Sequence, residues 1–199
     1  DSGFCLYLEV RRGAGGYVCG EETTLINTME GYRREPRLKP PFPTEQGFLG
    51  KPTVINNCET LASVPFILSK GPQEFSKIGS DKATGTKIIS LSGSVQRPGL
   101  AEVPMGTTLR DIVEDIGGGP VSGHVLTAIA VGGPSSGVFP PSMLDTPIGP
   151  GLLHESGVML GAGGVIAIDE RTGIGEVVRT LAAYNAAESC GKCTPCREG

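Results

Sequence analysis

The sequence predicts a mixed α/β and α+β chain made of three parts. An apolar alternation typical of a strand, a glycine-rich turn and a helical stretch indicate an α/β part at residues 1–78. Strand-like runs around one helical stretch indicate a small α+β sheet at 79–170. A helical stretch that leads into three closely spaced cysteines forms the last part, 171–199.

Composition and charge exclude several classes of protein. The 199 residues include 31 glycines and 16 prolines, with 5% aromatic residues and no tryptophan, which excludes a coiled coil or helical bundle throughout. A hydrophobic content of 38% and a mean hydropathy of +0.01 argue against wholesale disorder. The formal charge of −4 gives no support for nucleic-acid binding. The chain has no run of about 18 apolar residues, so the sequence predicts no membrane span.

The cysteines and the chain ends indicate the setting. Three of the six cysteines crowd near the end of the chain, which favours a metal or cluster in a reducing compartment over a disulfide framework. We find no signal or transit-like segment. Because the chain starts without Met and stops just after its last cysteine, we expect a piece of a longer polypeptide.

The first part alternates between strand, turn and helix patterns. Residues 4–10 predict a strand, since apolar and other side chains alternate. A glycine-rich turn then leads to a predicted helix at 21–29. Five prolines exclude regular helix over 33–53, and a loop of this length favours function. Residues 56–68 predict a short helix that Pro65 should kink or end early.

The second part predicts a sheet packed on one helix. Strands are expected at 87–93, 100–103, 125–131 and 165–168, and the pattern resembles a ubiquitin-like β-grasp. Thr107 or Thr108 can cap the helix. The side chains expected on its buried face are Leu109, Ile112, Val113 and Ile116. The final helix has one apolar face, formed by Ile174, Val177, Val178, Leu181 and Tyr184.

The strongest chemical pattern is a C-x2-C-x2-C run. Its members are Cys190, Cys193 and Cys196. Thiolates at this spacing converge on one cluster if the backbone curls, and Gly191 and Pro195 favour a curl. The run is the first part of an iron–sulfur pattern. Zinc is the main alternative, although zinc sites more often pair two knuckles or add His, and His124 and His154 are isolated. Redox or structural thiols are a third possibility.

Two further stretches are candidates for ligand binding. A glycine-rich turn at 13–20 can present backbone N–H groups to a phosphate, although it lacks the G-x-G-x-x-G spacing. Glu21 and Glu22 follow it, where acids also complement the helix dipole. Cys19, as a lone cysteine, is expected to be a buried small apolar residue.

A proline-rich frame at 36–43 forms the other stretch. It can hold Lys39 and the ring of Phe42 against a flat ligand, or it is an ordinary loop with a surface lysine. Asn56 and Asn57 follow, and paired amides suit a helix cap, a turn, or the edge of a flavin or base.

Four ordered segments resemble one family. They lie at 13–23, 36–43, 50–60 and 188–199. Over nearly its whole length the chain resembles the NADH- and FMN-binding flavoprotein subunit of respiratory complex I (the 51 kDa type), with the related diaphorase subunits of NAD-dependent formate dehydrogenases and hydrogenases. The resemblance implies a partial Rossmann-like FMN/NADH domain at 1–78. It further implies an SLBB-type β-grasp domain at 79–170 and the start of a helical [4Fe–4S] domain at 171–199.

The resemblance implies an NADH:acceptor oxidoreductase. A hydride would pass from NADH to FMN, and single electrons would then pass to a [4Fe–4S] cluster that feeds a quinone-reducing respiratory complex. The alternative is a diaphorase subunit of an NAD-dependent formate dehydrogenase or hydrogenase. The sequence of residues 131–147 resembles this alternative slightly more. The implied partners are NADH, a [2Fe–2S] thioredoxin-like subunit and an iron–sulfur subunit. The implied location is the cytoplasm, or the cytoplasmic or matrix face of a membrane as a peripheral arm subunit.

The resemblance also implies a role for each motif residue. The FMN and nicotinamide site would be lined by Tyr17, Gly20, Glu21 and Glu22. Glu22 would be the catalytic-site contact to NADH, with Phe42 stacked near the adenine and Lys39 nearby. The hydrogen bonds to the flavin side would come from Asn56, Asn57 and Thr60. The cluster ligands would be Cys190, Cys193 and Cys196.

Parts of the family pattern fall outside the chain. The glycine-rich FMN loop and an acidic loop would precede Asp1, and the fourth cluster cysteine would follow Gly199. We therefore expect the 199 residues alone to be inactive and to hold neither FMN nor the cluster properly. Cys58 stands where many relatives have an apolar residue, so we expect it to pack. A non-enzymatic, zinc-stapled adaptor with a ubiquitin-like fold is the competing hypothesis.

Overall fold

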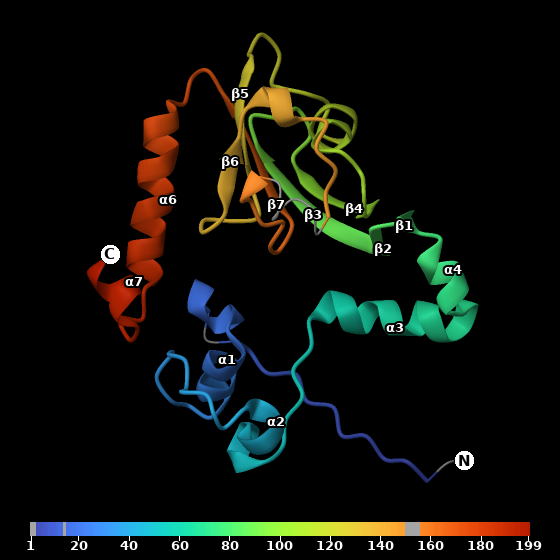
Figure 1. The fold of residues 1–199 in the computed structure, drawn as a ribbon, viewed down its shortest axis with the longest axis vertical. Helices are drawn as coiled ribbons and strands as arrows, with labels where there is room; N and C mark the ends of the chain where they lie inside the picture. Colours follow the sequence, from blue (N-terminus) through green and yellow to red (C-terminus); the bar gives the residue numbers. More distant parts are fainter. Residues whose placement is uncertain (1–2, 14, 150–155) are drawn as a thin grey trace. The chain divides into compact units, whose positions relative to one another are not determined.

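The computed structural model describes residues 3–13, 15–149 and 156–199. Ala14 of the predicted glycine-rich turn and His154 lie outside these ranges. The chain forms two compact units, of which unit 1 comprises residues 1–56 with 186–199, and unit 2 comprises 57–185 (Figure 1). Within the described ranges, no helix has both the length and the apolar character needed to cross a membrane.

Unit 2 is built on a five-stranded mixed sheet in the order β4-β3-β7-β5-β6. Its strands are β3 (Thr86–Gly93), β4 (Gly99–Pro104), β5 (Leu126–Val131), β6 (Gly137–Phe139) and β7 (Gly164–Asp169). β3 pairs antiparallel with β4 and parallel with β7, and β5 is antiparallel to both β6 and β7. This sheet confirms the predicted α+β architecture of the second part and the four predicted strands.

Short strands escaped the sequence prediction. β6, which begins at Gly137, is not among the predicted strands, and the two-residue strands β1 (Gly79–Ser80) and β2 (Ala83–Thr84) pair with each other. Strands of two or three residues show too little alternation to be recognised.

Gly93 closes β3 at φ 84°, where an added Cβ would lie 2.1 Å from the carbonyl oxygen of Ala167 in β7. Only glycine fits this approach of two backbones.

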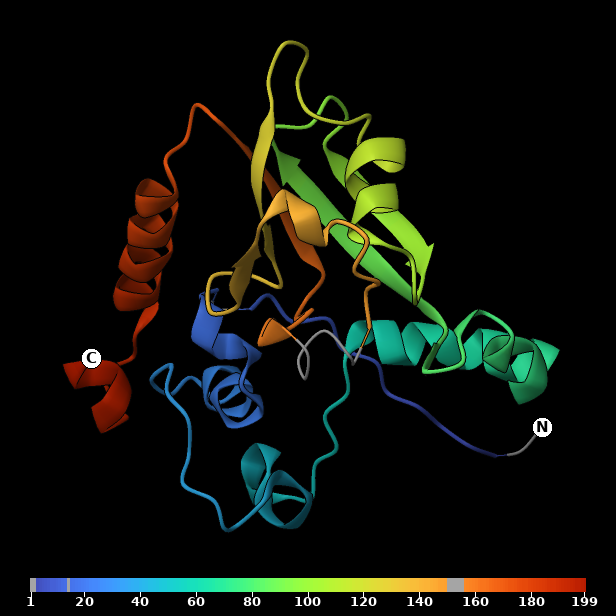
Figure 2. The same ribbon diagram turned by 45° about the horizontal axis from the view of Figure 1, so that its top comes forward.

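The core of unit 2 lies between one sheet face and the helical segment η3 (Asp111–Ile116). Figure 2 shows this segment, in yellow-green, across the sheet. Ile89 of β3 and Val165 of β7 are fully buried there because alternate side chains of a strand share one face. The helix side of the core comes from three side chains with 0% exposure: Leu109, Ile112 and Val113.

The helical segment departs from the predicted α-helix in one respect. Thr108 caps it, since its Oγ1 accepts the N–H of Asp111 at 3.1 Å while the Asp111 carboxylate accepts the N–H of Thr108. The segment then widens into a π-helix, in which Gly117 N–H donates to the carbonyl of Ile112. The wider turns rotate Ile116 off the buried face, so its predicted burial is wrong and it is 37% exposed.

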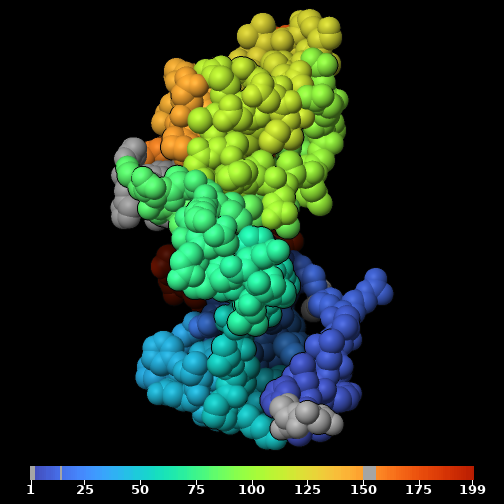
Figure 3. Space-filling model, turned by 90° about the vertical axis from the view of Figure 1, so that its right-hand side faces the viewer, coloured from blue at the N-terminus to red at the C-terminus, as the bar shows by residue number. Residues whose placement is uncertain are grey.

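Helices also adjoin the sheet of unit 2. In α6 (Ile174–Glu188), Val177 packs on a small cluster on the other sheet face, formed by Ala128, Ala130 and Ile168. The helices α3 (Cys58–Lys70) and α4 (Pro72–Ser76) precede the sheet and form one continuous mass with it in Figure 3. Pro65 does not end α3 early. The helix continues to Lys70, and the ring of Phe66 lies 6.3 Å from that of Phe75 in α4.

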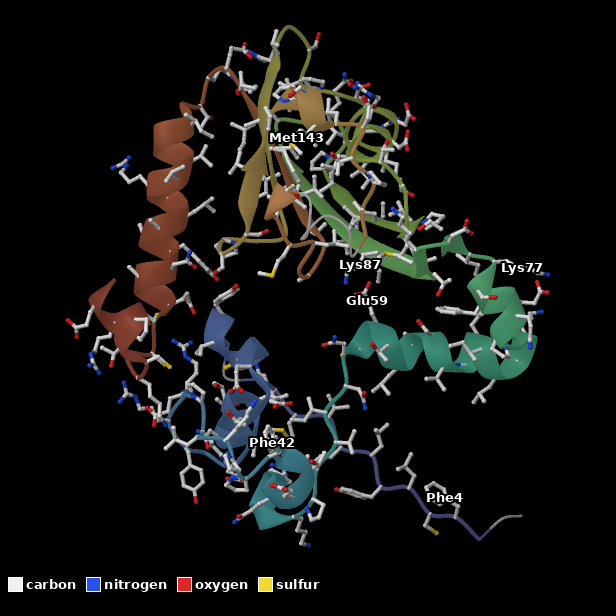
Figure 4. All side chains as sticks on the ribbon, in the orientation of Figure 1. Phe4, Phe42, Glu59, Lys77, Lys87 and Met143 are labelled. Atoms are coloured by element: carbon white, nitrogen blue, oxygen red, sulfur yellow. The ribbon has the colours of Figure 1, made fainter. Side chains whose placement is uncertain are left out.

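Glu59 joins the first turn of α3 to the sheet. Its carboxylate pairs with the ammonium group of Lys87 and accepts the N–H of Ile88 at 2.8 Å, and Figure 4 shows Glu59 and Lys87 pointing toward one another. Burial raises the pKa of Glu59, but the bonds from Lys87 and Ile88 outweigh it, and the net pKa is lowered. The carboxylate is therefore ionised at neutral pH and holds α3 against β3.

Unit 1 combines short helices with irregular chain. It contains η1 (Tyr17–Gly20), α1 (Glu22–Met29), α2 (Pro43–Gln46), η2 (Phe48–Gly50) and α7 (Thr194–Glu198). α1 confirms the helix predicted at 21–29. Residues 33–53 form the predicted long loop, interrupted only by α2 and η2, because proline fits the first turn of a helix but not its interior.

The predicted strand at 4–10 is absent from the described structure. These residues have no regular secondary structure, and Phe4 and Val10 are 78% and 93% exposed. Figure 4 shows Phe4 on an extended stretch of chain. An alternating pattern forms a strand only when a neighbouring strand accepts its hydrogen bonds, and no described strand pairs with this one.

Two isoleucines of η3 test the packing of unit 2. Ile112→Ala should cost about 2–5 kcal/mol of unfolding free energy, because it empties a fully buried site. Ile116→Ala should cost about 1 kcal/mol or less, since this side chain is partly exposed. Hydrogen exchange of the β3 and β7 amides measures both. Equal losses for the two variants would contradict the π-helical register.

Asp169 at the end of β7 provides a pH test. Its side chain is 1% exposed, and the Arg171 guanidinium, with the Ser94 hydroxyl, holds its pKa far below the ordinary value of 3.8. A lowered carboxyl pKa stabilises the fold above pH 3.8, and this contribution disappears as the pH falls through the folded value.

Asp169→Asn should therefore destabilise unit 2 at pH 7, and the difference from the wild type should shrink below about pH 4. Urea titrations across this pH range give the comparison. Asp81→Asn, in the exposed turn between β1 and β2, is the matched control and should stay near the wild type. A difference for Asp169→Asn that does not vary with pH would refute the ion-pair explanation.

Candidate functional site

The start of α1 positions two adjacent carboxylates in unit 1. Glu21 occupies the N-cap position, and its side chain accepts the N–H of Thr24 at 2.8 Å and the hydroxyl of Thr23 at 2.6 Å. Burial raises the pKa of Glu21, but these bonds and the one from Lys39 outweigh it and lower the net pKa. Glu21 is therefore a fixed anion. Glu22 follows as the first helical residue, with a side chain 42% exposed.

Lys39 of the proline-rich frame lies between the two carboxylates. Its Nζ is 2.5 Å from Oε1 of Glu22 and 3.2 Å from Oε1 of Glu21. The hydrogen bond to Glu22, followed by that to Glu21, raises the pKa of Lys39, so the ammonium group stays charged. Two carboxylates and one ammonium give the group a net charge of about −1. The structure thus brings together three residues that the sequence separates.

Arg37 attaches the proline-rich frame to α1. Its N–H donates to the Thr23 hydroxyl at 2.8 Å, and its guanidinium donates to Oδ1 of Asn27 at 2.6 Å and to Glu30 at 2.5 Å. Asn27 in turn donates to the carbonyl of Glu35 at 2.6 Å. Thr23 and Asn27 are buried, so these bonds are shielded from water. They fix the backbone two residues before Lys39.

The remaining predicted residues of this part present accessible groups. Phe42 precedes α2, and its ring is 51% exposed; Tyr17 is 49% exposed. At Gly20 an added Cβ would meet nothing within 4 Å, and its φ is not in the left-handed region. The described chain itself therefore does not require glycine at this position. Cys19 is not fully buried as predicted: it is partly exposed, and its thiol donates to the carbonyl of Gly15 at 3.1 Å.

The asparagine pair falls at the boundary of the two units. Asn56 belongs to unit 1, whereas Asn57 and Thr60 belong to unit 2. Asn57 is the N-cap residue of α3, but its side chain makes no capping hydrogen bond. All three side chains are exposed. Cys58, the first residue of α3, is also exposed, which corrects the expectation that it packs.

The cysteine run is curled, as Gly191 and Pro195 predict. α6 ends at Glu188, Gly191 has a φ of 74°, and Cys193 is the N-cap residue of α7. All six cysteines are free thiols. Three soft thiol donors on one curl fit the type of ligand that an iron–sulfur cluster takes.

Side chains far away in the sequence hold this curl within unit 1. Arg33 donates to the carbonyl of Cys190 at 2.9 Å. Lys192 donates to the carbonyl of Pro36 at 2.6 Å and lies 3.2 Å from the carboxylate of Glu35. These contacts join the cysteine run to the loop that leads to Lys39. Sequence reasoning missed them, since 157 positions separate Arg33 from Cys190 and no local pattern marks such a pair.

One other cluster of metal-ligating side chains stands out in the described ranges: His124, Asp169 and Glu170. Nδ1 of His124 lies 2.8 Å from Glu170. The Asp169 carboxylate, however, is already bound by the guanidinium and N–H of Arg171. The positive charge of Arg171 repels a metal cation from this place. The cluster is therefore a network of ion pairs within unit 2.

Three known families match successive regions of the chain. Residues 3–66 match the Nuo51 FMN-binding domain. Residues 88–139 match the SLBB domain, which coincides with the sheet of unit 2 from β3 to β6. Residues 176–199 match the NADH-ubiquinone oxidoreductase-F iron-sulfur binding region, which contains the cysteine run.

Similar proteins are subunits of NADH-quinone oxidoreductases and of hydrogenases. Over its full length the chain is 47% identical to the F 2 subunit of NADH-quinone oxidoreductase in Rhizobium meliloti. It is 45% identical to the HndC subunit of the NADP-reducing hydrogenase in Solidesulfovibrio fructosivorans. It spans 47% and 40% of the lengths of these relatives. A crystal structure of an NAD+-reducing [NiFe]-hydrogenase in the H2-reduced state matches with a TM-score of 0.82 and 39% identity, covering 94% of this chain and 31% of that one. Over its whole length the chain is thus similar to NADH-quinone oxidoreductase F subunits and to a related hydrogenase subunit, and it spans less than half of the length of these relatives.

Proposed function

We propose that this chain is part of an NADH-oxidising flavoprotein subunit, to which it contributes the nicotinamide side of the nucleotide site and three cluster ligands. One observation carries the proposal. The Glu21–Glu22–Lys39 group and the cysteine run lie in the same compact unit and are joined by Arg33, Glu35 and Lys192. A nucleotide site and a redox centre must be close for electrons to pass between them.

The acidic group suits the departure of a hydride. NADH loses a negative hydride and leaves a positively charged nicotinamide ring. A nearby group of net negative charge stabilises that positive ring relative to the neutral one. In this proposal Glu22, the more exposed carboxylate, contacts the nucleotide. Lys39 keeps both carboxylates in place, and the exposed ring of Phe42 offers a stacking surface for the adenine.

The flavin side is proposed from exposed polar groups. Gly20, where the chain leaves open space, permits the close approach of a flat ring. Tyr17 would border the same ligand, and the exposed side chains of Asn56, Asn57 and Thr60 would supply its hydrogen bonds. When bound, FMN accepts a hydride and releases electrons one at a time. The chain's own residues supply binding, orientation and charge.

The cluster would be held by Cys190, Cys193 and Cys196, with the fourth cysteine elsewhere in the protein. The proposed limits of the three domains are 1–78 for FMN and NADH, 79–170 for the SLBB-type domain and 171–199 for the cluster. The proposed acceptor is quinone, reached through a [2Fe–2S] thioredoxin-like subunit and an iron–sulfur subunit. The proposed site of action is the cytoplasm, or a peripheral arm on the cytoplasmic or matrix face of a membrane.

A hydrogenase-linked diaphorase is the second candidate. The 45% identity to the hydrogenase subunit is almost equal to the 47% identity to the quinone oxidoreductase subunit. Both candidates would use the same nucleotide and cluster residues, so they differ in the direction of electron flow and in the redox partner that exchanges electrons with the cluster. Purifying the natural complex and identifying the dehydrogenase or hydrogenase that accompanies it decides between them.

Glu22→Gln tests the nucleotide site in the full-length natural protein. Removing the charge should raise the Kd for NADH about tenfold, the loss expected for one charge-assisted hydrogen bond, with the FMN content unchanged. Glu74→Gln is the matched control, because Glu74 also pairs with a lysine, Lys77, at 2.5 Å, but in α4. NADH titration with flavin fluorescence gives both values. Unchanged NADH affinity in Glu22→Gln would contradict the role of Glu22.

Cys193→Ser tests the cluster in the same full-length protein, purified without oxygen. The wild type should contain iron, sulfide and FMN, and the variant should lose most of the iron while it keeps the FMN. Cys58→Ser is the matched control, since Cys58 is also an exposed free thiol, and should leave the iron content unchanged. Zinc without iron, sulfide or flavin would refute the proposed function and favour the zinc-stapled adaptor.

A further inference from the structure

Ser189 lies between the end of α6 and the cysteine run and makes two hydrogen bonds with it. Its Oγ is 3.2 Å from Sγ of Cys196 and 3.2 Å from the backbone N of Gly191. Both partners belong to the curl that holds the cysteines. The hydroxyl is partly buried, so water competes with it less than with a fully exposed group.

The two contacts fix the direction of the hydrogen bond to sulfur. A serine hydroxyl has one proton to donate and two lone pairs to accept. The N–H of Gly191 can only donate, so it uses a lone pair of Ser189 and leaves the proton free. A cysteine that ligates a metal is a thiolate, which can only accept. The Ser189 O–H therefore donates to Cys196 once this sulfur is a ligand.

We propose that Ser189 sets the reduction potential of the cluster through the hydrogen bond that its hydroxyl group donates to the sulfur of Cys196. This inference rests on the proposed function, because it requires the cysteines to be cluster ligands. Reduction adds one electron to the cluster and increases the negative charge on its sulfur ligands, and no bond breaks or forms. The hydrogen bond is stronger in the more negative state, so it favours reduction.

Two arginines also donate to the backbone of the curl, and each is paired with a carboxylate: Arg33 with Glu35 and Arg197 with Glu198. Arg33 donates to the carbonyl of Cys190, and Arg197 donates to the carbonyl of Gly191 at 3.3 Å. These cations bind backbone oxygens, whereas Ser189 is the hydroxyl that contacts a cysteine sulfur in the described part of the chain. It is therefore a positioning and tuning residue and takes no part in hydride transfer.

Ser189→Thr and Ser189→Val form the matched pair for a test in the full-length natural protein. Threonine and valine have nearly the same shape and differ in the hydroxyl group. Redox titration monitored by electron paramagnetic resonance measures the midpoint potential of the cluster. We expect Ser189→Thr to stay near the wild type. In Ser189→Val, the ratio of reduced to oxidised cluster at a given potential should be about ten times lower. This corresponds to a midpoint potential that is lower by about 59 mV for one electron.

Three controls make the outcomes distinct. Thr194→Val removes another hydroxyl of the motif, at the first residue of α7, and should leave the potential unchanged. If Ser189→Val fails to assemble a cluster, Ser189→Ala replaces it. In the wild type, exchange into D2O should shift the iron–sulfur vibrations, and this shift should be smaller in Ser189→Ala.

The results separate this inference from the proposed function. Equal potentials in the wild type, Ser189→Thr, Ser189→Val and Ser189→Ala, with iron and sulfide present, would overturn the role of Ser189 and leave the proposed function intact. Equal shifts in Ser189→Thr and Ser189→Val would assign the effect to packing and also overturn it. A wild-type protein without iron and sulfide would overturn the proposed function itself.

Discussion

Unit 1 depends on a buried polar network around α1. Thr23, Thr24 and Asn27 of this helix are buried, and Ile26 is its only apolar side chain in the described core. The bonds of Arg37 to Thr23, Asn27 and Glu30 replace the apolar contacts that usually hold a helix in place. Hydrogen bonds are directional, whereas apolar contacts are not. The network therefore fixes the position of the proline-rich frame, and with it Lys39.

Unit 2 has the opposite construction. Its main core consists of apolar side chains from the strands, from η3 and from the segments between them, and it gains stability from the area removed from water. Such a core tolerates changes in charge on its surface but not changes in volume. The division of the chain matches this difference: the unit with a polar network contains the Glu21–Glu22–Lys39 group and the cysteine run, whereas the unit with an apolar core contains only Asn57 and Thr60 of the candidate residues.

The sequence predicts those elements whose patterns are local. β3, β5, β7, α1 and α6 follow from alternation or helical periodicity within one segment. Residues 4–10 have the same kind of pattern but form no strand, because pairing depends on a distant neighbour. At η3, periodicity predicted the helix correctly but not its π-helical winding, which moves Ile116 off the core.

The candidate site shows the same limit. Motif resemblance indicated Glu21, Glu22 and Lys39 individually, and the structure adds the ion pairs among them. The contacts of Lys192 with Glu35 and Pro36 join segments about 156 positions apart, so no local spacing could indicate them. The same holds for the bond between Arg33 and Cys190. The side chains that connect the two parts of the site were therefore accessible only from the fold.

The charges in unit 1 are arranged in a direction that suits electron flow. Glu21, Glu22 and Lys39 form a group of net negative charge, which stabilises the positive ring left when a hydride departs. Arg33 and Arg197 donate to backbone carbonyls of the cysteine run, and Lys192 lies within the run. Glu35 and Glu198 pair with these three cations, so the group has a net charge of about +1, which stabilises an added electron there. Under the proposed function, the first group makes the nucleotide a better electron donor and the second makes the cluster a better acceptor. Under this proposal both the nucleotide group and the cysteine run lower the free energy of the electron transfer. The contact between Glu35 and Lys192 holds the two groups within one unit.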